Sequence, residues 1–180
     1  MKFKKIVASF ALLPLCVTIS HAADVAGTLC EKTDKVVFSC PLDTANKIVS
    51  ICSSADASGS SAHFRYVYGR LSKPELVFPP AGHPDTDAFA NSHLVYGGGT
   101  GGTAYSFSNG GYKYIVYSIS GTNFDRGGVL IQRAGATAAL KEMKCQKGKL
   151  VESNDKTLID TTMRWKPDPD IQAHGLPSVH

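Results

Sequence analysis

The sequence predicts a mainly β fold, a single antiparallel β-barrel or β-sandwich of about 8–10 short strands. Short runs of alternating or β-branched residues recur from end to end, a pattern typical of strands with one buried face. Turn-forming residues separate these runs, and no repeat of fixed period suggests an array of smaller units. These observations favour one domain of short antiparallel strands around a single core.

The first half of the chain contains four predicted strands, at residues 36–40, 47–52, 63–70 and 75–78. In the third, Phe64, Tyr66 and Tyr68 fall on one face because alternate residues of a strand point the same way. His63 and Arg65 then take the opposite face. The prolines and glycine of residues 79–87 oppose both helix and sheet pairing, so this stretch is predicted to be a stiff loop.

The second half shows a stronger strand pattern, with predicted strands at residues 105–108, 112–119 and 128–133. The sequence Asn109-Gly110-Gly111 between the first two supplies the positive φ angles of a tight hairpin turn. Residues 136–145 suit either a strand or a short helix, and we predict a strand. The sequence therefore places a β-hairpin at residues 105–119.

The last residues differ in character. Residues 154–165 carry Leu158, Ile159 and Met163 at helical spacing, which predicts one or two turns before the prolines at positions 167 and 169. Trp165 is expected to anchor this short helix in the core. Residues 166–180 are predicted to form a flexible C-terminal tail, so the β domain is expected to span residues 23–165.

The first 22 residues have the pattern of a cleaved secretory signal peptide. Three lysines within the first five residues precede an apolar run at residues 6–19, which ends in the small-residue motif Ser20-His21-Ala22. We place the cleavage after Ala22, with Ala23 as the near-equal alternative. A retained anchor is disfavoured because Pro14 interrupts the run, and a lipoprotein is disfavoured because a bulky leucine precedes Cys16. The pattern predicts a periplasmic or secreted protein.

Cleavage at this site changes the charge of the chain. The full sequence has 19 Lys and Arg against 15 Asp and Glu, a net charge of +4, and three of the lysines lie in the signal segment. The chain after cleavage has 16 basic and 15 acidic residues, which gives a net charge of +1. Such a surface lacks the concentrated basic face that phosphate binding needs, so nucleic acid is not an expected partner. The mature chain also has no predicted transmembrane segment.

Four cysteines remain after cleavage: Cys30, Cys40, Cys52 and Cys145. An even number in an exported chain predicts two disulfides. A hairpin of residues 36–40 and 47–52 would set Cys40 opposite Val49 and turn Cys52 to the other face, which disfavours a bond between those two cysteines. Of the remaining pairings we predict Cys30–Cys40 with Cys52–Cys145.

Two motifs suggest ligand chemistry, and neither predicts a cofactor. Residues 97–102 match the dinucleotide-binding glycine pattern, but a strand follows where that motif needs a helix, so they are interpreted as a strand connection. His83, Asp85, Asp87 and His93 could provide metal ligands from one region. Because aspartates in such loops commonly serve turns, no metal site is predicted.

The tyrosines suggest a recognition face. All seven lie between residues 66 and 117, the region with the strongest strand pattern. Tyrosine is common in ordinary strands and is also enriched at interfaces, so most of these rings are expected to form the wall of the domain. The candidate binding face comprises Arg65, Tyr66, Tyr68, Tyr112 and Tyr114.

These observations predict a small exported, disulfide-stabilised binding protein of the cell envelope that acts on another protein or an envelope component. Its size, export signal and β architecture resemble those of small periplasmic inhibitors of lysozyme and immunity proteins, without a matching motif. An envelope hydrolase with a site built from His63, His83, His93 and nearby carboxylates is the alternative function. A structural envelope protein without catalytic activity is a third possibility.

Overall fold

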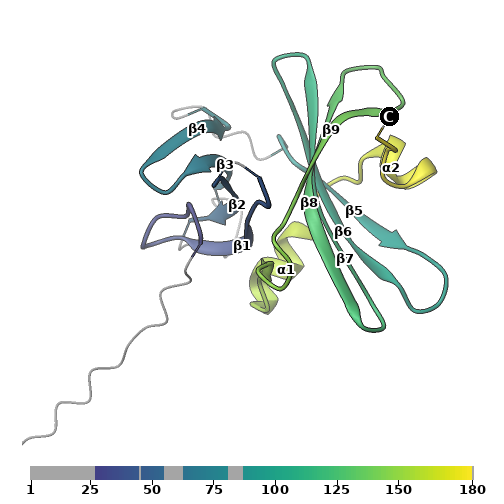
Figure 1. Cartoon of the computed structure of the whole chain (residues 1–180), viewed down its shortest axis with the longest axis horizontal. Helices are drawn as coiled ribbons and strands as arrows, with labels where there is room; N and C mark the ends of the chain where they lie inside the picture. The colour runs from purple at the N-terminus through teal and green to yellow at the C-terminus, as the bar shows by residue number, and fades with distance from the viewer. Residues whose placement is uncertain (1–26, 45, 55–62, 81–86, 180) are drawn as a thin grey trace, which may run out of the picture.

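The computed structural model describes residues 27–44, 46–54, 63–80 and 87–179. Within these ranges the chain forms two antiparallel sheets of five strands each. Figure 1 shows the sheets side by side, with β1–β4 on the left and β5–β9 on the right. The predicted mainly β fold is confirmed, and the two separate sheets pack as a sandwich.

The first sheet has the strand order β10-β1-β2-β3-β4. Its strands are β1 (Lys35–Pro41), β2 (Ile48–Ser53), β3 (Phe64–Arg70), β4 (Lys73–Phe78) and β10 (Val151–Glu152). The first four match the four strands predicted for this half of the chain. Cys40 pairs with Val49, so the predicted register of the first hairpin is confirmed.

The second sheet has the strand order β5-β6-β7-β8-β9. Its strands are β5 (Ala90–Val95), β6 (Gly101–Asn109), β7 (Tyr112–Gly121), β8 (Phe124–Arg133) and β9 (Ala139–Lys144). The predicted tight turn joins β6 to β7: Asn109 pairs with Tyr112, and Gly110 and Gly111 have φ values of 58° and 80°. The strand interpretation of the region around β9 is also confirmed.

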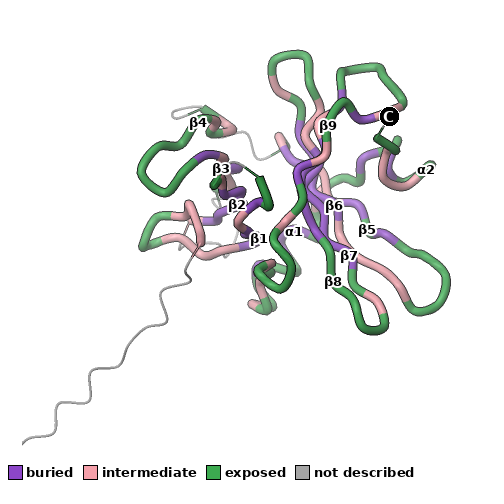
Figure 2. Tube along the Cα trace, viewed as in Figure 1, coloured by how far each residue is buried: buried purple, intermediate pink, exposed green. Residues whose placement is uncertain are grey.

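The main core lies between the two sheets. Phe38, Ile51 and Tyr66 from the first sheet pack with Phe107 and Val116 from the second, and all are buried. As predicted, Phe64, Tyr66 and Tyr68 turn toward this core together. In Figure 2 the buried segments lie in the middle of the sheets, whereas the ends of the hairpins are exposed. Burial of aromatic rings from both sheets holds the two layers together.

One short helix, α1 (Lys156–Thr162), lies beside the lower end of the sandwich (Figure 1). Asp155 is its N-cap and accepts a hydrogen bond of 2.8 Å from the backbone N–H of Thr157. Leu158 points into the main core. Just after the helix, Trp165 stacks on Phe89 at 5.3 Å between ring centroids. The predicted helix and its tryptophan anchor are therefore both present.

The C-terminal segment differs from the predicted flexible tail. Residues 169–174 form a second helix, α2 (Pro169–His174), with Asp168 as its N-cap. Proline is well suited to the first helical position, where no intrahelical partner for an N–H exists. Beyond α2, Val179 forms a bridge with Ala139 of β9. Pro169 thus begins a new helix, which packs on the outer face of the second sheet.

Two disulfides are present, but the predicted pairing was wrong. The bonds are Cys30–Cys52 and Cys40–Cys145, with Cα–Cα distances of 5.4 and 5.6 Å. Cys40 points into the space between the sheets and is fully buried. Cys30 lies on the opposite face of the first sheet, so these two cysteines cannot meet.

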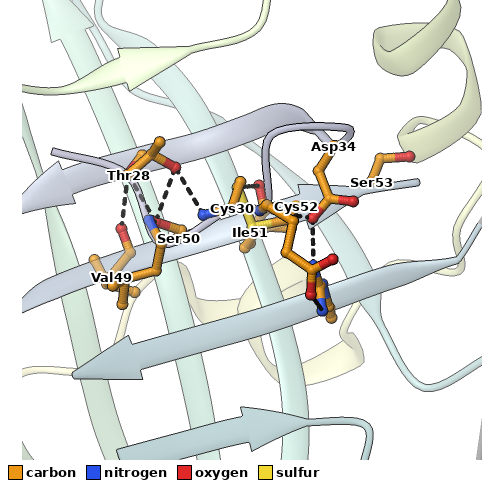
Figure 3. The surroundings of a disulfide bond; sticks show 12 residues. Thr28, Cys30, Asp34, Val49, Ser50, Ile51, Cys52 and Ser53 are labelled. Atoms are coloured by element: carbon orange, nitrogen blue, oxygen red, sulfur yellow. Dashed lines mark hydrogen bonds and ion pairs between the residues drawn. A yellow bond between two sulfur atoms is a disulfide. The ribbon is translucent and has the colours of Figure 1, made fainter. Parts of the chain in front are cut away.

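The position of Cys30 follows from the segment before β1. The backbone N–H of Leu29 donates to the Ser50 hydroxyl at 2.9 Å, and the Ser39 hydroxyl donates to the carbonyl of Gly27 at 2.9 Å. Figure 3 shows this segment along β2, with Cys30 bonded to Cys52. The segment therefore covers the outward face of the first sheet, where alternation had placed Cys52.

The second disulfide links the two sheets. Leu42, just after β1, forms a bridge with Cys145, just after β9. The backbone N–H of Asp43 donates to the carbonyl of Lys144 at 2.9 Å, which extends this contact. Cys40 and Cys145 consequently face each other at the junction of the sheets. None of the helices formed by the described residues is long and apolar enough to cross a membrane.

Candidate functional site

The structure separates the five residues of the candidate binding face. Tyr66 is only 1% exposed and lies against Phe107 in the core. Tyr68 and Tyr114 are half-buried at the edge of the same core, whereas Tyr112 is exposed at the β6–β7 turn.

Arg65 lies on the opposite face of β3 and forms ion pairs with Glu31 and Asp34. Figure 3 shows Asp34 near the first disulfide, and Arg65 pairs with Cys52 across β2 and β3. Its guanidinium group is thus engaged within the segment before β1. The five residues do not share one exposed surface.

The other sequence candidates are placed as follows. Gly98 and Gly99 form the turn between β5 and β6, as the strand-connection interpretation predicted, and both have a φ of 72°. His83 and Asp85 lie outside the described residues. Among the residues that the structure describes, no group of three His, Cys, Asp or Glu side chains is arranged to hold a metal ion.

A cavity of about 370 Å³ lies between α1 and the inner face of the second sheet. We call it the α1 cavity. Its apolar wall consists of Val37, Leu158, Ile159 and Met163. Its polar lining consists of Asn91, His93, Thr103, Tyr105, Glu152, Ser153 and Thr162. Five elements thus meet here: the short helix, β1 and the edge strand β10 of the first sheet, and the first two strands of the second sheet.

The rim of this cavity is exposed and partly apolar. Met163 is 71% exposed, and Ile159 is also exposed on the same helix. Large apolar side chains with this exposure next to a concave surface are typical of places where another molecule binds. The combination of an apolar rim and a polar floor distinguishes this cavity from the sealed core beside it.

Two residues of the polar floor, His93 and Thr103, belong to a row of paired residues that continues into β7. Thr103 of β6 pairs with His93 of β5 on one side and with Ser118 of β7 on the other. The preceding row on the same face contains Tyr105 and Val116, which belong to the main core. The inner face of the second sheet therefore changes from apolar to polar where the first sheet no longer covers it.

Glu152 of β10 stands above this row. One of its carboxylate oxygens accepts a hydrogen bond of 2.6 Å from the Ser118 hydroxyl, so the glutamate reaches across from the first sheet to the second. Burial in the concave surroundings raises the pKa of this carboxyl, and the negative charge of Asp125 raises it further. Burial also raises the pKa of Tyr105 to about 12.

Among the described residues, His93 and Ser118 are not placed to act as a base and a nucleophile. Because Thr103 lies between His93 and Ser118, these two side chains are two strand spacings apart, roughly 10 Å. A serine activated by histidine needs a direct hydrogen bond, and the Ser118 hydroxyl instead donates to Glu152. His63 precedes β3 in the first sheet and does not line the α1 cavity. Of the histidines of the predicted hydrolase site that the structure describes, His93 lines the α1 cavity and His63 does not, so these two are not brought together there.

Sequence reasoning missed Glu152, Thr103 and Ser118. For Ser118 a signal existed: along β7 the inward-facing positions change from Tyr114 and Val116 to serine, which indicates that the apolar contact ends there. Glu152 had no such signal because its strand has only two residues. Its position depends on pairing with Phe38 far away in the chain.

No protein-family model, curated protein or solved structure matches this chain.

Proposed function

We propose that this chain is a small exported, disulfide-stabilised binding protein of the cell envelope, of the inhibitor or immunity type, which binds a protein partner at the α1 cavity. The supporting observation is the cavity itself, with an exposed apolar rim and a polar floor. The rigid surroundings suit a binding role, because a site held by two sheets and a disulfide loses little freedom on association.

Export is supported by the N-terminal pattern and by the cysteines. Two disulfides persist best in an oxidising compartment such as the periplasm or the extracellular space. Mass spectrometry of the protein recovered after export checks this directly. The expected N-terminus is Ala23, and an intact Met1 in the exported protein would contradict the proposal.

The binding function is tested by capture from envelope extract of the cells that produce the protein. Met163→Glu places a charge on the cavity rim, and Leu71→Glu makes the same change at the β3–β4 turn of the other sheet. These two residues have the same exposed fraction, 71%, so the variants are matched. The proposal expects a protein that is captured by the wild type and Leu71→Glu and is lost with Met163→Glu.

Two results would overturn this proposal. Capture that is equal for Met163→Glu and Leu71→Glu would show that the partner binds elsewhere. Recovery of no protein by the wild type at physiological salt would argue against a binding function. Circular dichroism of each variant shows whether the fold is intact before the comparison is made.

A further inference from the structure

Glu152 is the only charged residue among the described residues that line the α1 cavity, apart from the titratable His93. Its carboxylate accepts a hydrogen bond from the Ser118 hydroxyl, and a carboxylate can accept further hydrogen bonds. An ionised carboxylate is an acceptor only, so the site favours a donor group with positive charge.

Most carboxylates of the described residues have a lysine or arginine beside them, and Glu152 does not. Eight carboxylates of the described residues form ion pairs with lysine or arginine. Within the ranges that the structure covers, Glu152 and Asp125 have no such partner, although Asp125 is near enough to raise the pKa of Glu152. Neither carboxylate thus has a salt-bridge partner among the described residues.

The apolar wall restricts the kind of side chain that fits the α1 cavity. Leu158, Ile159 and Met163, from α1 and its C-terminal cap, line the cavity together with Glu152. Lysine and arginine side chains combine an apolar methylene stem with a cationic end, so they match such a surface along their length. A purely apolar side chain would bury the carboxylate without a partner, which is unfavourable.

We infer that the α1 cavity receives a lysine or arginine side chain of the protein partner, with its cationic end at Glu152 and its stem along α1. This inference rests on the proposed binding function and adds the chemistry of the group that is recognised. The Ser118 hydroxyl, which does not line the cavity, donates a hydrogen bond to this carboxylate.

The inference is tested without the partner, by titrating the exported protein with small amides and following backbone amide NMR signals. The probes are Nα-acetyl-arginine amide and Nα-acetyl-lysine amide, with Nα-acetyl-norleucine amide as the apolar control. We expect saturable shifts around Thr103, Ser153 and Ile159 with the two cationic probes only. Equal shifts with norleucine, or no shifts with either cationic probe, would overturn the inference.

Two variants make the test specific. Glu152→Gln keeps an acceptor for Ser118 and removes the charge, and we expect it to weaken binding of the arginine probe by about tenfold or more. Glu142→Gln is the matched control, because Glu142 also accepts a hydrogen bond from a hydroxyl, that of Tyr117, but lines a different cavity. Binding to Glu142→Gln should match the wild type, and an equal loss in both variants would contradict the assignment.

Capture experiments distinguish this inference from the proposed function. A partner that is lost with Met163→Glu but retained fully by Glu152→Gln would support binding at the cavity and overturn recognition of a basic side chain. A partner that is lost with both variants, while Glu142→Gln retains it, would support both proposals.

Discussion

The Ser118 hydroxyl donates a hydrogen bond of 2.6 Å to the Glu152 carboxylate, which joins the middle strand of the second sheet to an edge strand of the first. This contact stands where the apolar core ends and the α1 cavity begins. A carboxylate placed there is accessible to a ligand, yet its surroundings are less favourable for charge than water.

We expect Glu152 to lower stability at neutral pH. Its pKa in the folded chain is raised above 4.5, the usual value, which applies to the unfolded chain. At a pH between the unfolded and the folded pKa, the folded chain therefore binds more protons than the unfolded chain. The free energy of unfolding of the wild type therefore falls as the pH rises through this window. Glu152→Gln should be at least as stable as the wild type at pH 7, with a gain of no more than about 0.5 kcal/mol.

Melting temperatures of both proteins across the pH range check this expectation. The advantage of Glu152→Gln should shrink as the pH falls toward 4.5, because the wild-type carboxyl becomes neutral. A variant that is clearly less stable than the wild type at pH 7 would show that the carboxylate serves the fold instead.

Asp168 is expected to be important for stability. Its buried carboxylate caps α2 and accepts hydrogen bonds from Ser106 at 2.8 Å and Lys113 at 3.1 Å. Burial would raise its pKa, but these hydrogen bonds outweigh that effect and lower it. We expect Asp168→Ala to lower the free energy of unfolding by about 2–4 kcal/mol, since both the cap and a buried acceptor are lost.

Urea unfolding of Asp168→Ala and Asp170→Ala tests this role. Asp170 pairs with the same Lys113 at 2.6 Å but is exposed, so its removal should change stability by less than about 1 kcal/mol. Because the pKa of Asp168 is lowered on folding, its contribution is present above the unfolded pKa and is lost as the pH falls through the folded value. Similar effects of the two substitutions would contradict the assignment.

The two disulfides should differ in their contribution. Their sequence separations are 22 for Cys30–Cys52 and 105 for Cys40–Cys145, which correspond to roughly 3 and roughly 5 kcal/mol in the chain-entropy model. We expect the Cys40→Ala, Cys145→Ala double variant to be less stable than the Cys30→Ala, Cys52→Ala variant. Chemical denaturation of both variants gives this order, and the reverse order would contradict the expectation.

The pairing can be checked independently by tryptic peptide mapping without reduction. Lysine and arginine residues separate all four cysteines into different tryptic peptides, so each pairing gives distinct linked masses. The structure requires linked peptides that contain Cys30 with Cys52 and Cys40 with Cys145. A Cys30–Cys40 link would contradict it.

Trp165 is expected to stabilise the fold. Its ring meets Phe64 edge-on at 4.7 Å between centroids and stacks on Phe89 at 5.3 Å, so it holds the end of α1 against both sheets. We expect Trp165→Ala to cost about 2–4 kcal/mol of unfolding free energy and Trp165→Phe to cost less. Circular dichroism during urea unfolding measures both, with Phe124→Ala at an exposed hairpin end as the control. An effect of Trp165→Ala no larger than that of the control would disprove the anchoring role.

Much of the fold could be predicted from local pattern. Alternation placed Phe64, Tyr66 and Tyr68 on one face, and the glycines after Asn109 identified the tight turn. The alternation of apolar and polar residues did not predict β5. The inward residues of this strand face the polar cavity, and its outward residues face α2. Both faces of that strand are mixed, so the alternation that identifies a strand with one buried face is missing.

The sequence by itself determined the mainly β architecture, the register of the first hairpin and the opposite orientation of Cys40 and Cys52. These properties depend on neighbours within one strand or one turn, where residue type and backbone geometry act directly. Only the tertiary structure decided the disulfide pairing and the position of Glu152 above Ser118. These contacts join residues far apart in the chain. They depend on how the segment before β1, the edge strand β10 and the two sheets pack against one another.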